Sequence, residues 1–216
     1  MSEIVTLDIN SPPVQYLCKK DKRLAKVIST IGSISYEPHE EDPFDFMVHE
    51  IIEQMLSVKA GQKIYGRLKD LCEGDITPDS VMRLSEEDIR ATGTSKAKAV
   101  YIKGIAEAVN SGSLVFEELR FLSDEDVRKR LTALHGVGDL TAKMYLIFVL
   151  NRQDNLPYED GAFLQAYRWA YKTNDLSVQS IKSKCKKWKP YSSIAARYFY
   201  RALDAGLTKE EFHLYK

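Results

Sequence analysis

The residues best suited to chemistry lie in two short segments in the second half of the chain. In LHGVG, the residues Gly136, Val137 and Gly138 separate two apolar helical stretches. In LPYEDGAF, the acidic pair Glu159 and Asp160 precedes an aromatic-rich stretch. Glycines permit positive φ angles and let a ligand approach the backbone closely. A lone carboxylate can cap a helix, or it can stabilise positive charge that develops on a bound molecule.

The glycine segment predicts a site for an anion such as phosphate. The next helix should begin at Gly138 or Asp139, so its unpaired N–H groups and the positive end of its dipole face the turn. Such a site needs no lysine, and it would position a nucleic acid backbone without reading its sequence. The alternative is a common turn between two helices.

The position of Asp160 is compatible with a role at the same site. A helix over 139–151 runs for about 20 Å, and the loop 152–159 can span about 26 Å. The chain can therefore return Asp160 to the end of the helix where the glycines lie. Taken alone, the residues favour the simpler interpretation that Asp160 caps the helix that follows it.

The elements that must position these residues are helical. We predict an all-α fold, a compact bundle of about ten helices, because apolar residues recur at helical spacing and no run alternates like a strand. Asp42 followed by Pro43 marks one helix start. The expected longer helices span 14–31, 43–56, 59–72, 94–110, 123–134, 139–151, 161–172, 177–188 and 192–205.

The charge is neutral overall but uneven along the chain. The 31 basic side chains balance 31 acidic ones, yet residues 172–202 contain eight Lys or Arg and a single acid, Asp175. This segment predicts a basic face, although a solvated lysine-rich helix surface fits equally well.

The cysteines and the apolar runs exclude several classes of protein. Cys18, Cys72 and Cys185 lack metal-ligand spacing, which favours a reducing compartment over a disulfide framework, a zinc site or a four-cysteine cluster. The N-terminal residues do not read as a signal peptide. No apolar run approaches the ~20 residues of a membrane span.

Four segments together resemble the helix-hairpin-helix superfamily of base-excision DNA glycosylases, most closely its 3-methyladenine DNA glycosylase II (alkylpurine glycosylase) branch. They extend from about Asp42 to Gly206, and in chain order they are IIEQMLSVKAGQKI, LHGVGDLTAKMY, LPYEDGAF and WKPYSSIAARYFYRA. The resemblance implies a single domain over 1–216 with the hairpin motif at about 123–151. It also implies that both termini join a second helical subdomain and that DNA lies in a cleft between the two subdomains.

The resemblance assigns Asp160 as the catalytic carboxylate of a monofunctional enzyme. Bifunctional relatives carry a lysine nucleophile where this chain has Leu140, and we expect Lys143 to be a surface residue. Cleavage of an N-glycosidic bond gives the sugar oxocarbenium character, which a fixed anion stabilises. An alkylated purine leaves readily because it is already positively charged, so one carboxylate suffices, although Glu159 stays open as a second acid.

The resemblance also assigns residues that contact the DNA. Base flipping leaves a gap in the stack, and Met55 stands where relatives have an apolar wedge. Gln54 beside it would hydrogen-bond the opposite base, and the alternative for Met55 is a core position at a helix end. The expected DNA-binding set is Gly136, Val137, Gly138, Thr141, Gln54 and Met55.

An electron-poor base should be held by aromatic faces. Tyr200 stands where bacterial relatives have a pocket tryptophan, and Leu140 where they have another. The expected base pocket is Tyr200, Leu140, Trp188, Tyr191 and His49. His135 replaces the more common hairpin proline, where it tolerates the turn or donates to a phosphate.

No cofactor is required for this chemistry, but the resemblance suggests Na+ or K+ bound by the hairpin carbonyls of Thr132, Leu134 and Val137. The expected partner is duplex DNA containing alkylated bases, with no membrane. The protein is expected to be an intracellular monomer, in the cytoplasm or nucleoid of a bacterium or in the nucleus of a eukaryote. Two alternatives stay open: a non-catalytic helix-hairpin-helix DNA-binding protein, and a glycosylase for another damaged base.

Overall fold

The computed structural model describes residues 4–37 and 42–215. Their contacts divide the chain into two compact units. Unit 1 combines the two ends of the chain, 1–38 and 151–216, and unit 2 is the continuous middle, 39–150. Each unit has its own buried apolar core.

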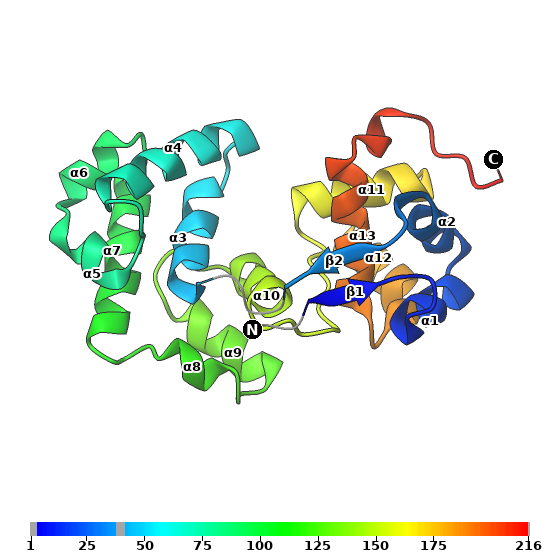
Figure 1. Ribbon diagram of the computed structural model, residues 1–216, viewed down its shortest axis with the longest axis horizontal. Helices are drawn as coiled ribbons and strands as arrows, with labels where there is room; N and C mark the ends of the chain where they lie inside the picture. Colours follow the sequence, from blue (N-terminus) through cyan, green and yellow to red (C-terminus); the bar gives the residue numbers. More distant parts are fainter. Residues whose placement is uncertain (1–3, 38–41, 216) are drawn as a thin grey trace. The chain divides into compact units, whose positions relative to one another are not determined.

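Unit 1 is helical, and its core lies among α2, α11 and α13 (Figure 1). Its elements are β1 (Val5–Leu7), α1 (Pro12–Lys20), α2 (Lys22–Ile31), β2 (Ile34–Tyr36), α11 (Gly161–Tyr171), α12 (Val178–Cys185), the 3-10 turn Lys186–Trp188, α13 (Ser192–Asp204) and the 3-10 turn Leu207–Lys209.

A two-stranded antiparallel sheet in unit 1 is the one departure from the expected all-α pattern among the described residues. It pairs Val5 with Tyr36 and Leu7 with Ile34. Three residues per strand give no room for an alternating pattern, which is why the sequence did not predict it.

The prediction of one continuous helix over 14–31 is wrong, because Asp21 separates α1 from α2. The Asp21 backbone is extended, with φ −144° and ψ 104°, and its carboxylate accepts hydrogen bonds from the N–H groups of Arg23 and Leu24. Asp21 is therefore the N-cap of α2. The helical spacing of apolar residues continues on both sides of it, so the pattern gave no sign of the break.

The same carboxylate is buried and anchors the aromatic core of unit 1. Its Oδ2 accepts hydrogen bonds from the hydroxyl of Tyr171 and from the indole N–H of Trp188 at 3.0 Å, and it pairs with Lys187 at 2.9 Å. Burial opposes ionisation, but the hydrogen bonds from Tyr171, Lys187 and Trp188 outweigh it and lower the pKa of Asp21.

Unit 2 contains the predicted hairpin. Its elements are α3 (Pro43–Glu53), α4 (Val58–Leu71), α5 (Pro78–Arg83), α6 (Glu86–Ala91), α7 (Lys96–Asn110), α8 (Phe116–Leu119), α9 (Asp124–Thr132) and α10 (Asp139–Phe148). Helix α3 packs against α4, α7 and α10, and α9 packs against α10. The α3 start predicted at Asp42 is confirmed, since Asp42 caps the N–H groups of Phe44 and Asp45.

No helix within 4–37 and 42–215 combines the length and apolar character needed to cross a membrane.

Replacing Asp21 with Asn should lower the free energy of unfolding by about 3 kcal/mol, because buried donors lose their charged acceptor. Urea denaturation measures this. The folded pKa is lowered, so the contribution is present above the unfolded pKa of about 3.9 and is lost as pH falls through the folded value. The difference between the two proteins should therefore shrink in acid.

The control is Asp175→Asn, which removes an exposed carboxylate bonded to the neighbouring Ser177. It should cost less than about 1 kcal/mol. Equal effects of the two substitutions would contradict the role given to Asp21.

Candidate functional site

Asp160 lies at the start of α11 as predicted, where it is the N-cap residue. Its backbone has φ −75° and ψ 129°, and its Oδ1 accepts a hydrogen bond of 2.7 Å from the N–H of Phe163. The positive end of the α11 dipole favours a carboxylate at this position. The cap and the proposed chemistry are compatible, because capping occupies one oxygen.

Tyr200 of α13 reaches the same oxygen. Its hydroxyl donates to Oδ1 of Asp160 at 3.0 Å, and its side chain is half-buried. Within 4–37 and 42–215, the hydrogen bonds to the Asp160 carboxylate all go to Oδ1. The structure thus brings together two predicted site residues, through a contact that the sequence did not suggest.

The loop before Asp160 is tied to the first turn of α13. The hydroxyl of Ser193 donates to the carbonyl of Asn155 at 3.1 Å and accepts from its N–H at 2.9 Å, and the N–H of Ser193 donates to the carbonyl of Gln153. Ser192 donates to Asp154 at 2.6 Å. These serines position the loop and were missed as site residues, although WKPYSS contains them.

The other predicted aromatics of unit 1 differ in exposure. Trp188 is fully buried, with its indole N–H on Asp21, so the structure argues against its predicted place in the base pocket. Tyr191 is half-buried and packs edge-on against Tyr16 at 5.4 Å. Glu159, the other possible acid, is exposed.

The basic segment 172–202 is less of a free face than the sequence suggested. Ion pairs engage Lys172 with Glu211, Lys187 with Asp21, and Lys189 with Asp154. Three further cations lie over aromatic rings of unit 1: Lys182, Lys184 and Arg197. Much of this charge therefore serves contacts within the unit.

In unit 2 the hairpin joins α9 to α10 as expected. Gly138 is the N-cap of α10, with φ −92°, and is exposed. Apart from Gly138 and its two chain neighbours, no atom of the described residues lies within 4 Å of the place where a Gly138 Cβ would stand, so a ligand can approach its backbone. The first N–H groups of α10 lie beside this open position, which keeps the predicted anion site geometrically possible.

Gly136 serves the fold of the hairpin. Its φ of +87° is left-handed, and a Cβ there would lie 2.2 Å from Cδ2 of Tyr101. The ring of Tyr101 also lies 4.8 Å from that of exposed His135. Gly136 is thus required by the packing of α7 against the turn.

Two residues predicted to bind DNA have buried side chains, and their contact with DNA stays a prediction. Val137 is 6% exposed and its N–H donates to the carbonyl of Leu134 at 3.1 Å. Thr141 is 5% exposed and its hydroxyl accepts a 3.5 Å bond from Nε2 of Gln54. The same Nε2 donates to the carbonyl of Gly136 at 3.1 Å. In this structure the Gln54 amide ties the turn after α3 to the hairpin, a role different from the predicted pairing with a base.

The expectation that Lys143 is a surface residue is wrong. Its side chain is 5% exposed and its Nζ lies 2.8 Å from Oδ2 of Asp139. Arg128 binds Oδ1 of Asp139 through Nε at 2.7 Å. Burial opposes ionisation, but the bonds from Lys143 and Arg128 lower the pKa of Asp139. The three side chains carry a net positive charge, so the acid at the start of α10 does not repel an approaching anion.

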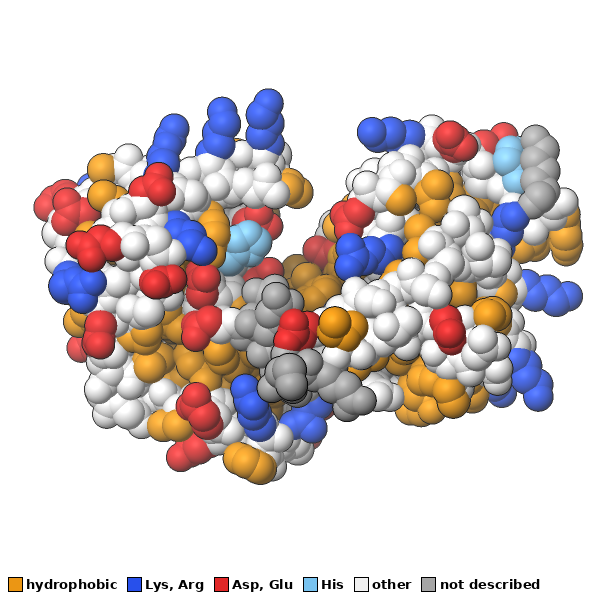
Figure 2. Space-filling model, in the orientation of Figure 1, with side chains coloured by type: hydrophobic (Ala, Val, Ile, Leu, Met, Phe, Trp, Pro, Cys, Tyr) orange, Lys and Arg blue, Asp and Glu red, His pale blue; other side chains and the backbone are white. Residues whose placement is uncertain are grey.

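Met55 lies in the turn between α3 and α4, and its side chain is fully exposed. The alternative of a core residue is therefore wrong for Met55, while its insertion into DNA stays a prediction. Figure 2 shows basic side chains gathered over α4, which contains the exposed residues Lys59 and Lys63. The sequence analysis missed this basic surface, whose signal was an i, i+4 lysine pair.

The remaining predicted residues lie in unit 2. His49 stacks edge-on against Tyr65 at 4.9 Å, and its Nε2 lies 3.4 Å from Oε1 of Glu53. Leu140 is half-buried near the start of α10. The predicted cation ligands Thr132, Leu134 and Val137 stay a prediction. The Leu134 carbonyl already accepts one hydrogen bond and has a second lone pair.

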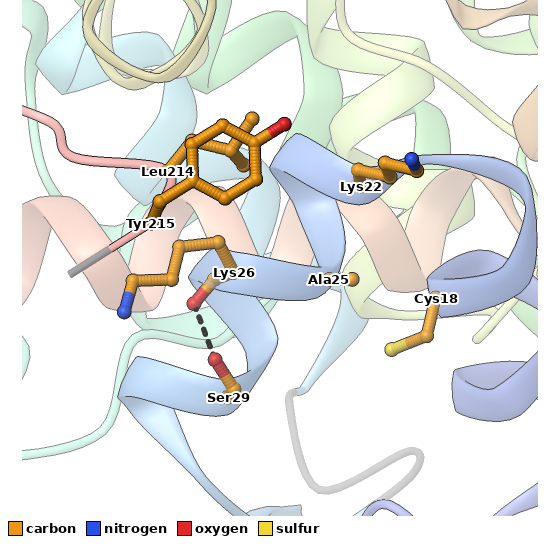
Figure 3. Close-up of a pocket in the computed structure, with 7 residues that line it drawn as sticks. All are labelled: Cys18, Lys22, Ala25, Lys26, Ser29, Leu214 and Tyr215. Carbon is orange, nitrogen blue, oxygen red and sulfur yellow. Dashed lines mark hydrogen bonds between the residues drawn. The ribbon is translucent and has the colours of Figure 1, made fainter.

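A separate pocket of about 310 Å³ lies between α2 and the C-terminal segment (Figure 3). Its lining includes no acid and no predicted site residue, and burial raises the pKa of its one thiol. The lining residues are Cys18, Lys22, Ala25, Lys26, Ser29, Leu214 and Tyr215.

The sequence and the structure were compared with known proteins. A family model described as HhH-GPD superfamily base excision DNA repair protein matches residues 48–190. DNA-3-methyladenine glycosylase 1 of Schizosaccharomyces pombe is 30% identical over 194 residues, which cover 86% of this chain and 84% of the relative.

Two solved structures are similar over nearly the whole chain. The DNA-3-methyladenine glycosidase of Bacillus halodurans has a TM-score of 0.81 and 33% identity, covering 97% of both chains. The 3-methyladenine DNA glycosylase of S. pombe, solved in complex with abasic DNA, has a TM-score of 0.83 and 27% identity, covering 90% of this chain and 97% of that one.

Gly136→Ala should lower the free energy of unfolding by about 2 to 4 kcal/mol. The alanine backbone would be strained in the left-handed conformation, and its Cβ would clash with the Tyr101 ring. Thermal or urea denaturation measures this. Gly138→Ala is the matched control and should leave stability within about 0.5 kcal/mol. It should nevertheless weaken DNA binding, because its Cβ would occupy the open side of the hairpin. Equal stability losses would contradict this division of roles.

Proposed function

Because the chain belongs to the HhH-GPD superfamily of base excision DNA repair proteins, we propose that it is a DNA glycosylase that removes alkylated purines of the 3-methyladenine and 7-methylguanine type from duplex DNA. The predicted resemblance and the predominantly helical fold are confirmed. The observation that carries the proposal is the carboxylate of Asp160 at the N-terminus of α11, whose Oδ1 accepts hydrogen bonds from Phe163 and Tyr200.

Asp160 acts on the sugar of the flipped nucleotide. As the N-glycosidic bond breaks, positive charge develops on the sugar, and a fixed anion binds this transition state more strongly than the neutral ground state. With Oδ1 engaged by Phe163 and Tyr200, Oδ2 faces the reaction, where it stabilises the cation and orients the attacking water. The electrons of the broken bond go to the departing base. The water oxygen then bonds to the anomeric carbon of the sugar, and the water gives up one proton to the solvent.

We propose alkylated bases as the substrate because their removal needs no general acid. An N3- or N7-alkylated purine carries positive charge before the bond breaks, and it leaves as a neutral base without protonation. Tyr200 donates its hydroxyl proton to Asp160 and so supports the carboxylate. The face of its ring stacks on the electron-poor base. No second carboxyl is needed as a general acid.

The DNA is held by backbone contacts and opened by an exposed side chain. The N-terminus of α10 with open Gly138 binds a phosphate. Exposed Met55 fills the gap that the flipped nucleotide leaves. Binding is to duplex DNA in the cellular compartment that holds the genome, and the protein acts as a monomer. A monovalent cation at the hairpin carbonyls stays a prediction on which no step depends.

Wild-type protein should release methylpurine from methylated duplex DNA, and Asp160→Asn should slow release by about 100-fold or more. The reason is that the amide cannot stabilise the sugar cation, although it can still cap α11. Single-turnover assays with chromatographic identification of the free base measure both.

Binding of Asp160→Asn to the same DNA should be nearly unchanged, which separates catalysis from folding. Near-normal release by this variant would contradict the mechanism. Tight binding by the wild type without release of any base would instead support a non-catalytic DNA-binding protein, and release of another base would change the substrate.

Borohydride should not trap a covalent adduct between the protein and DNA, because Leu140 offers no amine and the Lys143 ammonium is buried against Asp139. Denaturing electrophoresis of the reaction detects such an adduct. Leu140→Lys, which places an amine at this position, is the positive comparison. A strong trapped band with the wild type would contradict monofunctional chemistry.

A further inference from the structure

Helix α7 carries a lysine that binds the C-terminal end of α3. The Nζ of Lys98 donates to the carbonyl of Ile52 at 2.8 Å and to that of Gln54 at 2.5 Å. Helix α3 ends at Glu53, so these are carbonyls that the helix itself leaves unpaired. A cation is also favoured here by the negative end of the helix dipole.

The turn that Lys98 binds has an unfavourable backbone at its centre. Met55 has φ +60°, a left-handed backbone conformation that residues other than glycine rarely adopt. The Met55 side chain is fully exposed and cannot anchor the turn by packing. The conformation must therefore be held by its neighbours.

Gln54 and Lys98 hold the turn from two sides. The amide of Gln54 donates to the Gly136 carbonyl in the hairpin, while Lys98 binds the backbone carbonyl of the same Gln54. The turn is thus attached both to α7 and to the element proposed to bind a phosphate. The position of Met55 relative to the hairpin is fixed within unit 2.

We propose that Lys98 is a positioning residue for base flipping, which holds the turn between α3 and α4 so that Met55 enters the gap left by the flipped nucleotide. This inference rests on the proposed function. Lys98 touches neither the base nor the sugar, and its effect on the reaction passes through Met55.

The chain provides a matched control on the same helix. The Nζ of Lys103 donates to the carbonyl of Leu84 at 2.7 Å and to that of Met82 at 3.1 Å, at the C-terminal end of α5. Lys103 thus makes the same kind of contact without binding the turn that carries Met55. Lys103→Met measures the general cost of losing such a contact.

The test measures insertion separately from chemistry. Duplex DNA carries a tetrahydrofuran abasic site with 2-aminopurine beside it, and the fluorescence change on binding reports entry of a side chain into the stack. Lys98→Met should reduce insertion at least tenfold, while Lys98→Arg, which keeps a cationic donor, and Lys103→Met should change it less than twofold. Methylpurine release should fall in parallel for Lys98→Met.

A double variant tests whether Lys98 acts through Met55. Met55→Ala combined with Lys98→Met should release methylpurine no more slowly than Met55→Ala alone, because the wedge is already absent. The proposal would be overturned if the double variant released methylpurine more slowly than Met55→Ala by the full factor lost in Lys98→Met. It would also be overturned if Lys103→Met reduced insertion as much as Lys98→Met, or if Lys98→Met left insertion unchanged.

Failure of the proposed glycosylase function gives a different result from failure of the role proposed for Lys98. A wild-type protein that inserts into the abasic duplex but releases no base would refute the glycosylase assignment, while Lys98 would still be judged by fluorescence. If the wild type and Met55→Ala give the same fluorescence, Met55 is no wedge, and the role of Lys98 falls with it.

Discussion

The carboxylate of Asp160 depends on two donors that converge on one of its oxygens, and the packing of unit 1 fixes both donors. Phe163, which supplies the N–H, is fully buried and lies edge-on to Phe199 and to Trp188, with ring centroids 5.8 and 6.5 Å away. Trp188 is in turn held by the buried carboxylate of Asp21. The packing of α11 against α13 is thus supported by a core that contains the buried Asp21 carboxylate. A preorganised anion of this kind needs little rearrangement when positive charge develops on a substrate.

Unit 2 uses its polar side chains in a similar way, to fix backbone segments. The Lys98 ammonium binds the turn after α3, and the Tyr101 ring packs against the hairpin. The Gln54 amide, in that turn, donates a hydrogen bond to the hairpin. What these contacts leave exposed are the Met55 side chain and the backbone at Gly138. The exposed parts are those with a proposed contact to DNA, and the half-buried side chains of Gln54, Lys98 and Tyr101 keep them at fixed positions.

The features that the sequence predicted correctly depend on local rules. Asp160 caps α11 and Gly138 caps α10 because cap residues act within a few positions of the chain. The buried contact of Asp21 could not be predicted, because it joins Asp21 to Trp188 far along the chain. The ion pair of Lys143 with Asp139 is a local i, i+4 contact, but the burial of Lys143 is decided by tertiary packing and leaves no sign in the sequence. An aromatic residue at helical spacing carries no sign of its exposure. Trp188 could therefore be taken for a pocket residue although it belongs to the core.

If the ionised carboxylate of Asp160 stabilises a cationic sugar, the protein should also prefer a cationic sugar analogue to a neutral one, and this preference can be measured. Duplex DNA with a protonated pyrrolidine in place of the abasic sugar is compared with the neutral tetrahydrofuran form, for the wild type and for Asp160→Asn. The wild type should bind the cationic duplex more tightly, and Asp160→Asn should lose this preference while keeping its affinity for the neutral duplex. A preference that survives in Asp160→Asn would contradict this role of Asp160, because the cation would then be recognised by another group.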